Sequence, residues 1–429
     1  MDKVDVIIVG GGLAGLSCAY ELADSGMTVI VLERGDFSGS KNLTGGRIYV
    51  GPIREYLPDL WKEAPLERHV TKEFITLLGE TNSTTLELYS DRFNRPPYPS
   101  YTILRAKFDR WLADLVSEKG VFVVPQKNVN DLIKDGEKII GVRTEDEEIG
   151  SDCVVASDGI LSFLAEKAGL RKPFQPQHLA LGFKEVIALE SKAIEDRFRL
   201  GENEGAAQLF VGSLTQGMMG GGFLYTNENS LSLGMVVGIQ SLNQREPRGE
   251  IYKFLDEFKE RPEIRNLIRG GEAVEYSAHL ISEGGLHLKP KTYGDGILIT
   301  GDAAGLSLNM LVTVRGMEYA MVSGVLAGRT IKRAKERNDF SAASLAYYDQ
   351  LLSESFIIRE MTTFKNSLRV LENRRLFSKY PQAISNLFEK VMWVDEKPKE
   401  GLYKTFCEGL KKDFINFQSF KDWLQFKKI

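Results

Sequence analysis

Glycines near the amino terminus are the first residues in this chain whose spacing suggests chemistry. Gly10, Gly12 and Gly15 follow the apolar run 4–9 and open the apolar stretch 16–25, an order that predicts a buried strand, a tight turn and a helix. Gly10 would permit the turn, Gly12 would let the backbone approach a pyrophosphate, and Gly15 would let helix and strand pack closely. The loop residues predicted to bind a dinucleotide are Gly10, Gly12, Leu13, Ala14 and Gly15.

A second predicted strand, 27–32, delivers an acidic residue to the same site. It ends in Glu33 and Arg34, and a carboxylate about 20 residues beyond the glycines can accept hydrogen bonds from the two ribose hydroxyls of an adenosine. A lone glycine motif can be a chance turn, but here strand, helix, second strand and acid follow in the required order. We therefore include Glu33 and Arg34 among the predicted cofactor-binding residues.

A second glycine signature lies almost the whole chain away. The apolar run 297–300 ends in Gly301 and Asp302, and an aspartate at this point can accept hydrogen bonds from a sugar-alcohol chain. NAD has no ribityl chain to hold. The two signatures together therefore predict FAD rather than NAD.

The start of a predicted helix, 318–335, is a candidate for contact with the flavin ring. Gly316 and Met317 precede this helix, and backbone N–H groups at a helix N-terminus can stabilise the negative charge of a reduced flavin. The alternative is a helix start with no ligand. The helix begins just beyond Asp302, and this position favours a contact between the helix N-terminus and the flavin.

Three spaced segments resemble the FAD motifs of the glutathione-reductase and para-hydroxybenzoate-hydroxylase superfamily. They are the signature 301–305, Asp158-Gly159 after an apolar run, and the segment 105–109. The resemblance implies that Arg105 meets the FAD phosphates, for which a guanidinium is well suited, with an exposed helix start as the alternative. It also implies that Asp158 and Gly159 are structural parts of the flavin domain close to the cofactor. Val129, on a further predicted strand, joins the predicted cofactor-binding set.

More narrowly, the loop 41–47 and the segment 220–229 look like those of FixC proteins. These proteins are relatives of electron-transfer-flavoprotein:quinone oxidoreductase and, more distantly, of geranylgeranyl reductases, and the resemblance runs from residue 4 to about residue 390. It implies that the loop follows the pyrophosphate and ribityl chain of FAD. Lys41 and Arg47 would supply positive charge, and Gly45 and Gly46 would permit close backbone approach. A solvated basic loop is the alternative interpretation.

The triple glycine before Phe223 is the clue to the substrate. Glycines weaken packing in a sheet and often mark the close approach of a ligand or of another backbone. The resemblance implies that Gly220, Gly221 and Phe223 face a quinone, menaquinone or ubiquinone, with glycine amides near a quinone oxygen. Met219 stands where the single-chain relatives have a tyrosine, so the type of quinone stays open. A bulged sheet edge is the alternative.

Charge and cysteine content limit the classes of function. Fifty-five basic against 59 acidic residues give a net charge of −4, which is too little and of the wrong sign for a nucleic-acid-binding surface. Three scattered cysteines and four histidines without ligand spacing predict no disulfide framework and no metal site. The resemblance therefore implies that the 4Fe–4S cluster of related quinone oxidoreductases sits on a separate ferredoxin-like subunit, as in the FixC–FixX arrangement.

The composition also predicts where in the cell the protein works. Low cysteine use and the lack of a signal peptide predict the cytoplasm, and no run reaches the roughly 18 apolar residues of a membrane span. A quinone partner would still require contact with the membrane surface, so we expect a peripheral protein at the cytoplasmic face. Apolar C-terminal residues at helical spacing are expected mainly to pack on the chain's own core, with a partner or bilayer as the alternative: Phe406, Leu410, Phe414, Phe417, Phe420, Trp423, Leu424 and Phe426.

The predicted fold class is α/β. It combines a Rossmann-like FAD-binding domain with an antiparallel-sheet quinone-side domain, indicated by apolar and polar alternation, and a helical C-terminal region. The FAD domain would comprise residues 1–50, 100–165 and 290–335, the sheet domain 50–100 and 175–285, and the helical region 340–429.

Three functions are compatible with these patterns. The first is an FAD enzyme subunit that passes electrons from electron-transfer flavoprotein subunits, through the ferredoxin-like partner, to a membrane quinone. It would belong to a FixABCX-type complex, in which any bifurcating step would reside in the partner flavoprotein. The second is a prenyl-chain reductase like the geranylgeranyl reductases. The third is a non-catalytic FAD-bearing assembly subunit. No side chain is assigned to catalysis beyond the flavin.

Overall fold

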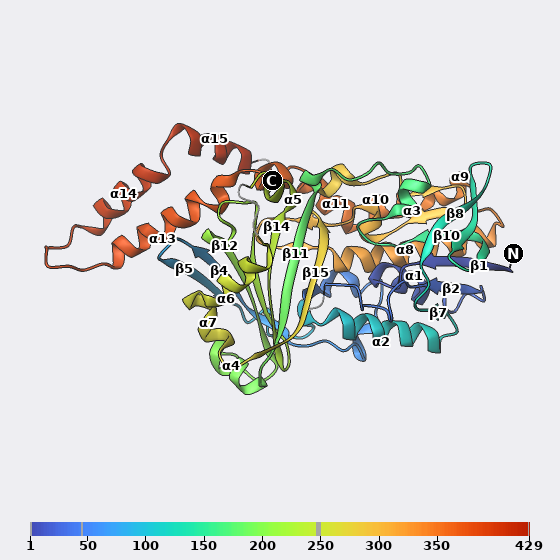
Figure 1. Cartoon of the computed structure of the whole chain (residues 1–429), viewed down its shortest axis with the longest axis horizontal. Helices are drawn as coiled ribbons and strands as arrows, with labels where there is room; N and C mark the ends of the chain where they lie inside the picture. The colour runs from blue at the N-terminus through green and yellow to red at the C-terminus, as the bar shows by residue number, and fades with distance from the viewer. Residues whose placement is uncertain (1, 44–45, 246–249, 428) are drawn as a thin grey trace. The chain divides into compact units, whose positions relative to one another are not determined.

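The computed structural model describes residues 2–43, 46–245, 250–427 and 429. The chain forms two compact units, each built from three separate segments (Figure 1). The first unit comprises Met1–Glu67, Ile103–His178 and Ile281–Lys365, and the second comprises Arg68–Thr102, Leu179–Leu280 and Asn366–Ile429. Both units mix helices and strands, so the predicted α/β class is confirmed.

A mostly parallel sheet organises the first unit, in the order β16-β17-β10-β1-β2-β7. Its parallel strands are β1 (Asp2–Val9), β2 (Val29–Leu32), β7 (Phe122–Val124), β10 (Glu148–Ala156) and β17 (Ile297–Ile299). Val9 pairs with both Leu32 and Ala156, and Ala156 pairs with Ile299. The strands therefore end together, and the residues that follow them meet at one edge of the sheet, where ligands bind in folds of this kind.

Shorter elements complete this sheet. The edge strand β16 (Tyr293–Gly294) runs antiparallel to β17. The hairpin of β8 (Val129–Asp135) and β9 (Lys138–Thr144) adds to β10. The first unit also contains β3 (Gly46–Tyr49), α3 (Phe163–Lys167), the two-stranded β18 (Leu308–Asn309) and β19 (Val314–Arg315), and the helices α2 (Arg105–Glu118), α9 (Ala342–Leu345), α10 (Tyr347–Glu354) and α11 (Phe356–Thr363).

Two helices, α1 (Leu13–Leu22) and α8 (Met317–Glu336), contact each other through their backbones (Figure 1). A Cβ atom on Gly324 would lie 2.1 Å from the Ala14 carbonyl oxygen, and one on Gly328 would lie 2.8 Å from Glu21 Cγ. Only glycine fits such an approach. Both helices begin slightly earlier than their apolar patterns predict, because the glycine turns lead directly into them.

The second unit contains a sheet in the order β15-β11-β14-β13-β12-β4-β6, with β5 paired to β4. Its strands are β4 (His69–Leu78), β5 (Ser83–Tyr89), β6 (Ser100–Ile103), β11 (Leu179–Ala188), β12 (Glu204–Gly212), β13 (Gly220–Thr226), β14 (Ser230–Gly238) and β15 (Glu272–Ser282). As predicted, β11 with β14, β12 with β13, β13 with β14, β4 with β5 and β4 with β6 pair antiparallel, whereas β4 pairs with β12 in parallel.

The triple-glycine strand β13 lies in the interior of this sheet, between β12 and β14. Its register with β14 is continuous, from Gly220 opposite Val237 to Thr226 opposite Leu231. The alternative interpretation of these glycines as a bulged sheet edge is therefore wrong.

One face of the sheet carries the core of the second unit. Apolar side chains such as Phe183, Phe210 and Leu224 pack there against α4 (Ser191–Phe198), α6 (Tyr252–Glu260) and α7 (Pro262–Ile268). Because successive side chains alternate between the faces of a sheet, Lys184, Phe223 and Tyr225 lie on the opposite face. The short helix α5 (Ile239–Asn243) follows β14.

The C-terminal region is helical, as predicted, with α12 (Ser367–Leu371), α13 (Lys379–Met392), α14 (Leu402–Asp413) and α15 (Phe417–Phe426). Helix α13 attaches to β4 through a hydrogen bond of 3.0 Å from Ser385 Oγ to the Leu77 carbonyl. The expected packing of the C-terminal aromatic residues on the core is wrong for six of them, which are at least 36% exposed: Leu410, Phe417, Phe420, Trp423, Leu424 and Phe426. Within the described residues, no helix is long and apolar enough to cross a bilayer.

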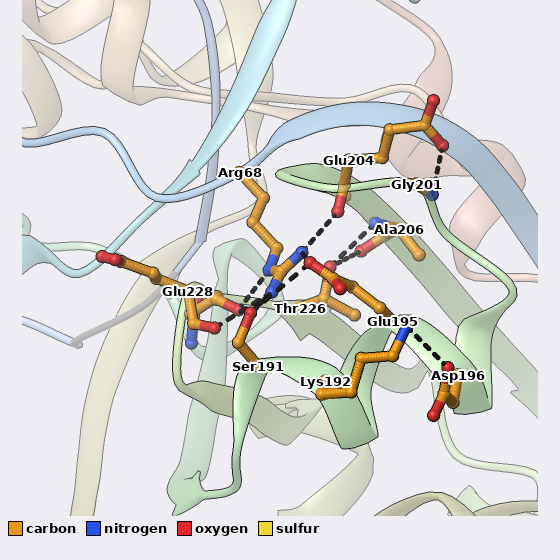
Figure 2. Close-up of polar contacts among 12 residues, drawn as sticks. Arg68, Ser191, Lys192, Glu195, Asp196, Gly201, Glu204, Ala206, Thr226 and Glu228 are labelled. Atoms are coloured by element: carbon orange, nitrogen blue, oxygen red, sulfur yellow. Dashed lines mark hydrogen bonds and ion pairs between the residues drawn. The ribbon is translucent and has the colours of Figure 1, made fainter.

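Arg68 connects several elements at the end of the second unit where the β13–β14 turn lies (Figure 2). The side chain is 1% exposed. Its guanidinium donates to the carbonyls of Asn227, Glu204 and Glu228, to Ser191 Oγ and to Glu195 Oε1, at 2.5 to 3.2 Å. The turn, the start of β12 and helix α4 are thus joined by one fully buried cation.

Replacing Arg68 with methionine should destabilise the protein by on the order of 3–5 kcal/mol, because three carbonyls and the Glu195 carboxylate lose their donor. Arg68→Lys should recover only part of this loss, since lysine lacks the planar fork. Urea unfolding followed by circular dichroism measures both effects. Arg95→Met is the matched control, because Arg95 is exposed and lies 3.9 Å from Asp91. Equal stability of the two methionine variants would show that the network contributes nothing.

Candidate functional site

The glycines of the first loop differ in their surroundings. Gly10 and Gly15 pack against backbone atoms, whereas Gly12 faces open space. Gly10 has φ +107°, and a Cβ on it would lie 2.3 Å from the Ser157 carbonyl oxygen. A Cβ on Gly15 would lie 2.1 Å from the Gly10 oxygen, whereas one on Gly12 would meet nothing within 4 Å. Gly12 caps the start of α1, which Leu13 and Ala14 open. The free space at this helix N-terminus fits an anion such as a pyrophosphate.

Glu33 is held against this loop by backbone donors. Its Oε2 accepts from the Gly11 N–H at 2.8 Å and its Oε1 from the Gly35 N–H at 2.6 Å. A carboxylate oxygen can accept more than one hydrogen bond, so both oxygens retain capacity for ribose hydroxyls. The neighbouring Arg34 is exposed.

Arg105 is fixed in place by Asp109, a residue whose role the sequence did not reveal. Arg105 Nε and Nη2 each donate to the Asp109 carboxylate at 2.7 Å, and Asn42 Nδ2 donates to the same carboxylate at 2.6 Å. Two of the five guanidinium N–H groups are thereby used, and the remainder can serve a phosphate.

Asp302 lies near Arg105, although almost 200 residues separate them. Burial raises the pKa of Asp302, and the positive charge of Arg105 acts in the opposite direction. No hydrogen bond from the described residues reaches the Asp302 carboxylate, which is half-buried. A half-buried carboxylate without a donor is suited to accept hydroxyl groups of a ligand.

Gly301 brings the second signature against the first. It has φ +60°, a Cβ on it would lie 2.8 Å from Ala14 Cβ, and its N–H donates to Ser323 Oγ at 3.0 Å. Ala14 belongs to α1 and Ser323 to α8. The contact between these helices therefore places the two signatures side by side.

The remaining predicted cofactor residues lie around the same sheet. Asp158 follows β10, and its Cα lies 3.3 Å from where a Gly10 Cβ would be. Asp158 Oδ2 accepts from the Leu164 N–H, whereas its Oδ1 is buried without a described partner, and burial raises its pKa. Gly159 has φ +75° and open space around it. Val129 is half-buried at the start of β8, on the hairpin beside β10.

Only part of the 41–47 loop contacts the other residues that were predicted to bind the cofactor. Lys41 is exposed, and Gly45 lies outside the described residues. A Cβ on Gly46 would lie 3.3 Å from Met317 Cε, so this glycine joins the start of α8. The Arg47 guanidinium lies over the Tyr49 ring, 4.6 Å from its centroid.

Arg315 precedes Gly316 at the start of α8 and was missed by sequence reasoning. It is 8% exposed, donates to Glu318, and donates to Glu360 at 2.9 Å. Burial raises the pKa of Glu318, and the Arg315 charge opposes this rise. The buried ion pair with Glu318 and the partly exposed one with Glu360 fix the turn from which Gly316 and Met317 enter the helix.

These residues fit FAD. The open space at Gly12, the Asp302 carboxylate, which receives no hydrogen bond from the described part of the chain, and the spare donors of Arg105 offer complementary groups for a pyrophosphate and for hydroxyl groups. The packing glycines hold these groups together. The residues that would hold the cofactor come from both glycine signatures.

The predicted quinone-side residues lie on β13, in the second unit. Gly220 has φ +142°, and a Cβ on it would lie 2.0 Å from the Val236 oxygen, while one on Gly221 would lie 2.6 Å from the Phe210 oxygen. Close strand approach therefore requires both glycines. Gly221 shares a face with Phe223, which stacks on Tyr225 at 5.3 Å between ring centroids, and Gly220 alternates to the other face.

Lys184 lies on the same face as Phe223 and is a second residue that sequence reasoning missed. It is fully buried, and its Nζ has no hydrogen-bond partner among the described residues. Burial lowers its pKa to about 7, against the influence of Glu275. In the sequence it is only one of the polar positions of an alternating strand, so no signal identified it.

Substituting Gly12 with valine should separate cofactor binding from folding. The Gly12 backbone, with φ −90° and ψ −175°, is open to any residue, and a Cβ there meets no protein atom. The apoprotein should therefore unfold at the wild-type midpoint, while FAD affinity falls at least about tenfold, or about 1.4 kcal/mol. Flavin fluorescence titration gives the affinity.

The control is Gly401→Val, at another glycine with open space and ordinary φ. It should bind FAD normally. Wild-type FAD affinity in the Gly12 variant would rule out a cofactor at this helix N-terminus.

Three family models match separate segments of the chain. Residues 5–92 match "FAD dependent oxidoreductase", residues 179–281 match "ETF-QO, ubiquinone-binding", and residues 369–428 match "ETF-QO/FixC family C-terminal domain". The first contains the glycine loop and Glu33. The second contains β11 to β14 and most of β15.

Curated relatives are similar over nearly their whole length. The probable electron transfer flavoprotein-quinone oxidoreductase YdiS of Escherichia coli is 41% identical over 411 residues, covering 96% of this chain and 95% of that protein. Protein FixC of Azotobacter vinelandii is 37% identical, covering 97% and 96%.

A solved structure shares the fold. The geranylgeranyl bacteriochlorophyll reductase-like protein of Thermoplasma acidophilum superposes with a TM-score of 0.74 at 21% identity, covering all of both chains. The family models and the relatives confirm the prediction of FAD as cofactor. The chain belongs to the FixC and electron transfer flavoprotein-quinone oxidoreductase family of FAD-dependent oxidoreductases.

Proposed function

We propose that this chain transfers electrons through FAD to a membrane quinone. The observation that carries the proposal is the match of residues 179–281 to a ubiquinone-binding family model, since this segment contains the face of the sheet formed by Gly221, Phe223 and Tyr225. An aromatic surface interrupted by glycine suits a flat, largely apolar ring. Menaquinone and ubiquinone both meet this description.

The chain's residues bind and polarise the cofactor. FAD supplies electron transfer, singly or in pairs, when it is bound. N–H groups at the start of α1 would hold the pyrophosphate, with Arg105 as a further phosphate donor, and Glu33 would hold the adenosine ribose. Gly316 and Met317, at the start of α8, would stabilise negative charge on the ring.

Electrons would arrive from electron-transfer flavoprotein subunits through a ferredoxin-like 4Fe–4S subunit resembling FixX. A 4Fe–4S cluster requires four thiolates, and this chain has three cysteines. Cys18 and Cys153 are buried, and burial raises the pKa of both thiols, which disfavours their use as ligands. A FixABCX-type complex would therefore carry the cluster on a partner, and any bifurcation in the partner flavoprotein.

A quinone substrate places the protein against a bilayer, and we assign this contact to α14 and α15 at the cytoplasmic face of the membrane. Exposed aromatic and basic side chains alternate there. Lys421 Nζ lies 4.7 Å from the Phe417 ring centroid, and Lys427 Nζ lies 4.0 Å from that of Trp423. Aromatic rings interleaved with lysines suit the interface of an anionic membrane.

The test is an anaerobic half-reaction with the full chain loaded with FAD. The flavin is reduced by electron-transfer flavoprotein and the ferredoxin-like partner, and then mixed with a menaquinone analogue, a ubiquinone analogue or a geranylgeranyl substrate. Flavin absorbance should return to the oxidised spectrum with a quinone and stay reduced with the prenyl substrate.

Reoxidation by the prenyl substrate alone would identify a prenyl reductase instead. A flavin that stays oxidised when reduced partner is supplied would identify an assembly subunit. Repeating the reaction with menaquinone in anionic vesicles should give faster turnover than in neutral vesicles, because the C-terminal lysines attract anionic lipid.

A further inference from the structure

A buried lysine, Lys184, lies beside the quinone-side residues of the sheet, and its amine has no hydrogen-bond partner among the described residues. We propose that Lys184 is a catalytic residue that donates a hydrogen bond, and then a proton, to a carbonyl oxygen of the quinone. This inference rests on the proposed function and assigns a further residue to the same site.

The strand register places Lys184 in line with Phe223. Lys184 pairs with Gly234 across β11 and β14, and Gly234 pairs with Phe223 across β14 and β13. Residues directly opposite one another in neighbouring strands point to the same face. The three residues therefore form one row across the sheet, which Leu209 of β12 continues.

Gly234 allows the two outer members of this row to meet. A Cβ on Gly234 would lie 2.4 Å from Phe223 Cζ and 2.5 Å from Lys184 Cβ. The missing side chain is thus replaced by the edge of the phenylalanine ring on one side and by the lysine stem on the other. Lys184 and Phe223 consequently lie next to each other on one buried face of the sheet, with Gly221 one alternation further along β13.

The row runs across three neighbouring strands, β11, β14 and β13. Two strand spacings of about 4.8 Å separate β11 from β13, a distance that a lysine stem and a quinone ring can bridge together. Glycine amides of β13 would meet one carbonyl oxygen, and the Lys184 ammonium the other.

Burial, opposed only in part by the charge of Glu275, explains why Lys184 can release a proton. Glu275 on β15 is the charged group that acts on it, and Gly234 on β14 carries no charge. The neighbouring Glu185 points to the opposite face, where it binds Lys259 of α6 at 3.0 Å. A buried ammonium without a bonded carboxylate is destabilised relative to the neutral amine.

The proposed step balances protons and electrons. A quinone becomes a quinol by taking up two electrons and two protons. The Lys184 Nζ–H bond breaks and an O–H bond forms at the quinone oxygen, the second proton comes from solvent, and both electrons come from the reduced FAD. The neutral lysine then regains its proton from solvent.

Lys184→Met tests the proposal because it removes the amine while keeping a stem of similar length. The rate of quinone reduction in the FAD-loaded chain should fall about 100-fold, as expected for loss of a general acid. Flavin reoxidation by ferricyanide, which needs no proton donor, should stay unchanged. Lys259→Met is the matched control, since it removes a lysine from the other face and should keep wild-type quinone reduction.

Two pH profiles distinguish proton donation from a structural role. Wild-type quinone reduction should fall as pH rises above about 7, where Lys184 loses its proton, whereas the methionine variant should not show this fall. Wild-type apoprotein should also gain stability between pH 7 and about pH 10, because the unfolded chain, with a lysine pKa of about 10.4, binds more protons there. The variant should lack this gain.

The outcomes separate the two proposals. If reduced wild-type protein is not reoxidised by any quinone, the proposed function fails. If wild type reduces quinone and Lys184→Met does so at the same rate, the role of Lys184 fails and the proposed function stands. A slowed variant that keeps the wild-type pH profile would also overturn proton donation by Lys184.

Discussion

The cofactor site depends on the backbone contact between α1 and α8. Gly324 and Gly328 let α8 approach the backbone of α1, and this approach sets Gly301 against Ala14. Without it, two signatures almost 300 residues apart could not face one ligand. Close packing of this kind tolerates no added methyl group, so the same glycines that shape the site also hold the first unit together.

In the second unit, hydrogen bonds from a buried arginine connect elements that lie far apart in the sequence. Arg68 replaces packing by hydrogen bonds where the β13–β14 turn, β12 and α4 come together. Gly221 and Gly234 permit close approach of strands and side chains, and they leave a face on which Phe223, Tyr225 and Lys184 are the prominent groups.

Local patterns predicted much of this molecule. The order of strand, glycines, helix and acid located Glu33, and alternation located β11 and β14, because these signals lie within one element. Arg68 could not be found this way, since most of its partners lie more than 120 residues away and three of them are backbone carbonyls. The buried, unpaired state of Lys184 likewise depends on tertiary packing. Helical spacing showed which C-terminal aromatic residues share a face, but not that the face is exposed.

If a quinone reacts at the face of β13, photolabelling should locate it there. The FAD-loaded chain is irradiated with an azido-quinone, and the labelled peptides are identified by mass spectrometry. Label should appear between Gly220 and Gly234, and excess unlabelled quinone should prevent it. Label confined to other segments, with this stretch unmodified, would show that the quinone does not bind at β13.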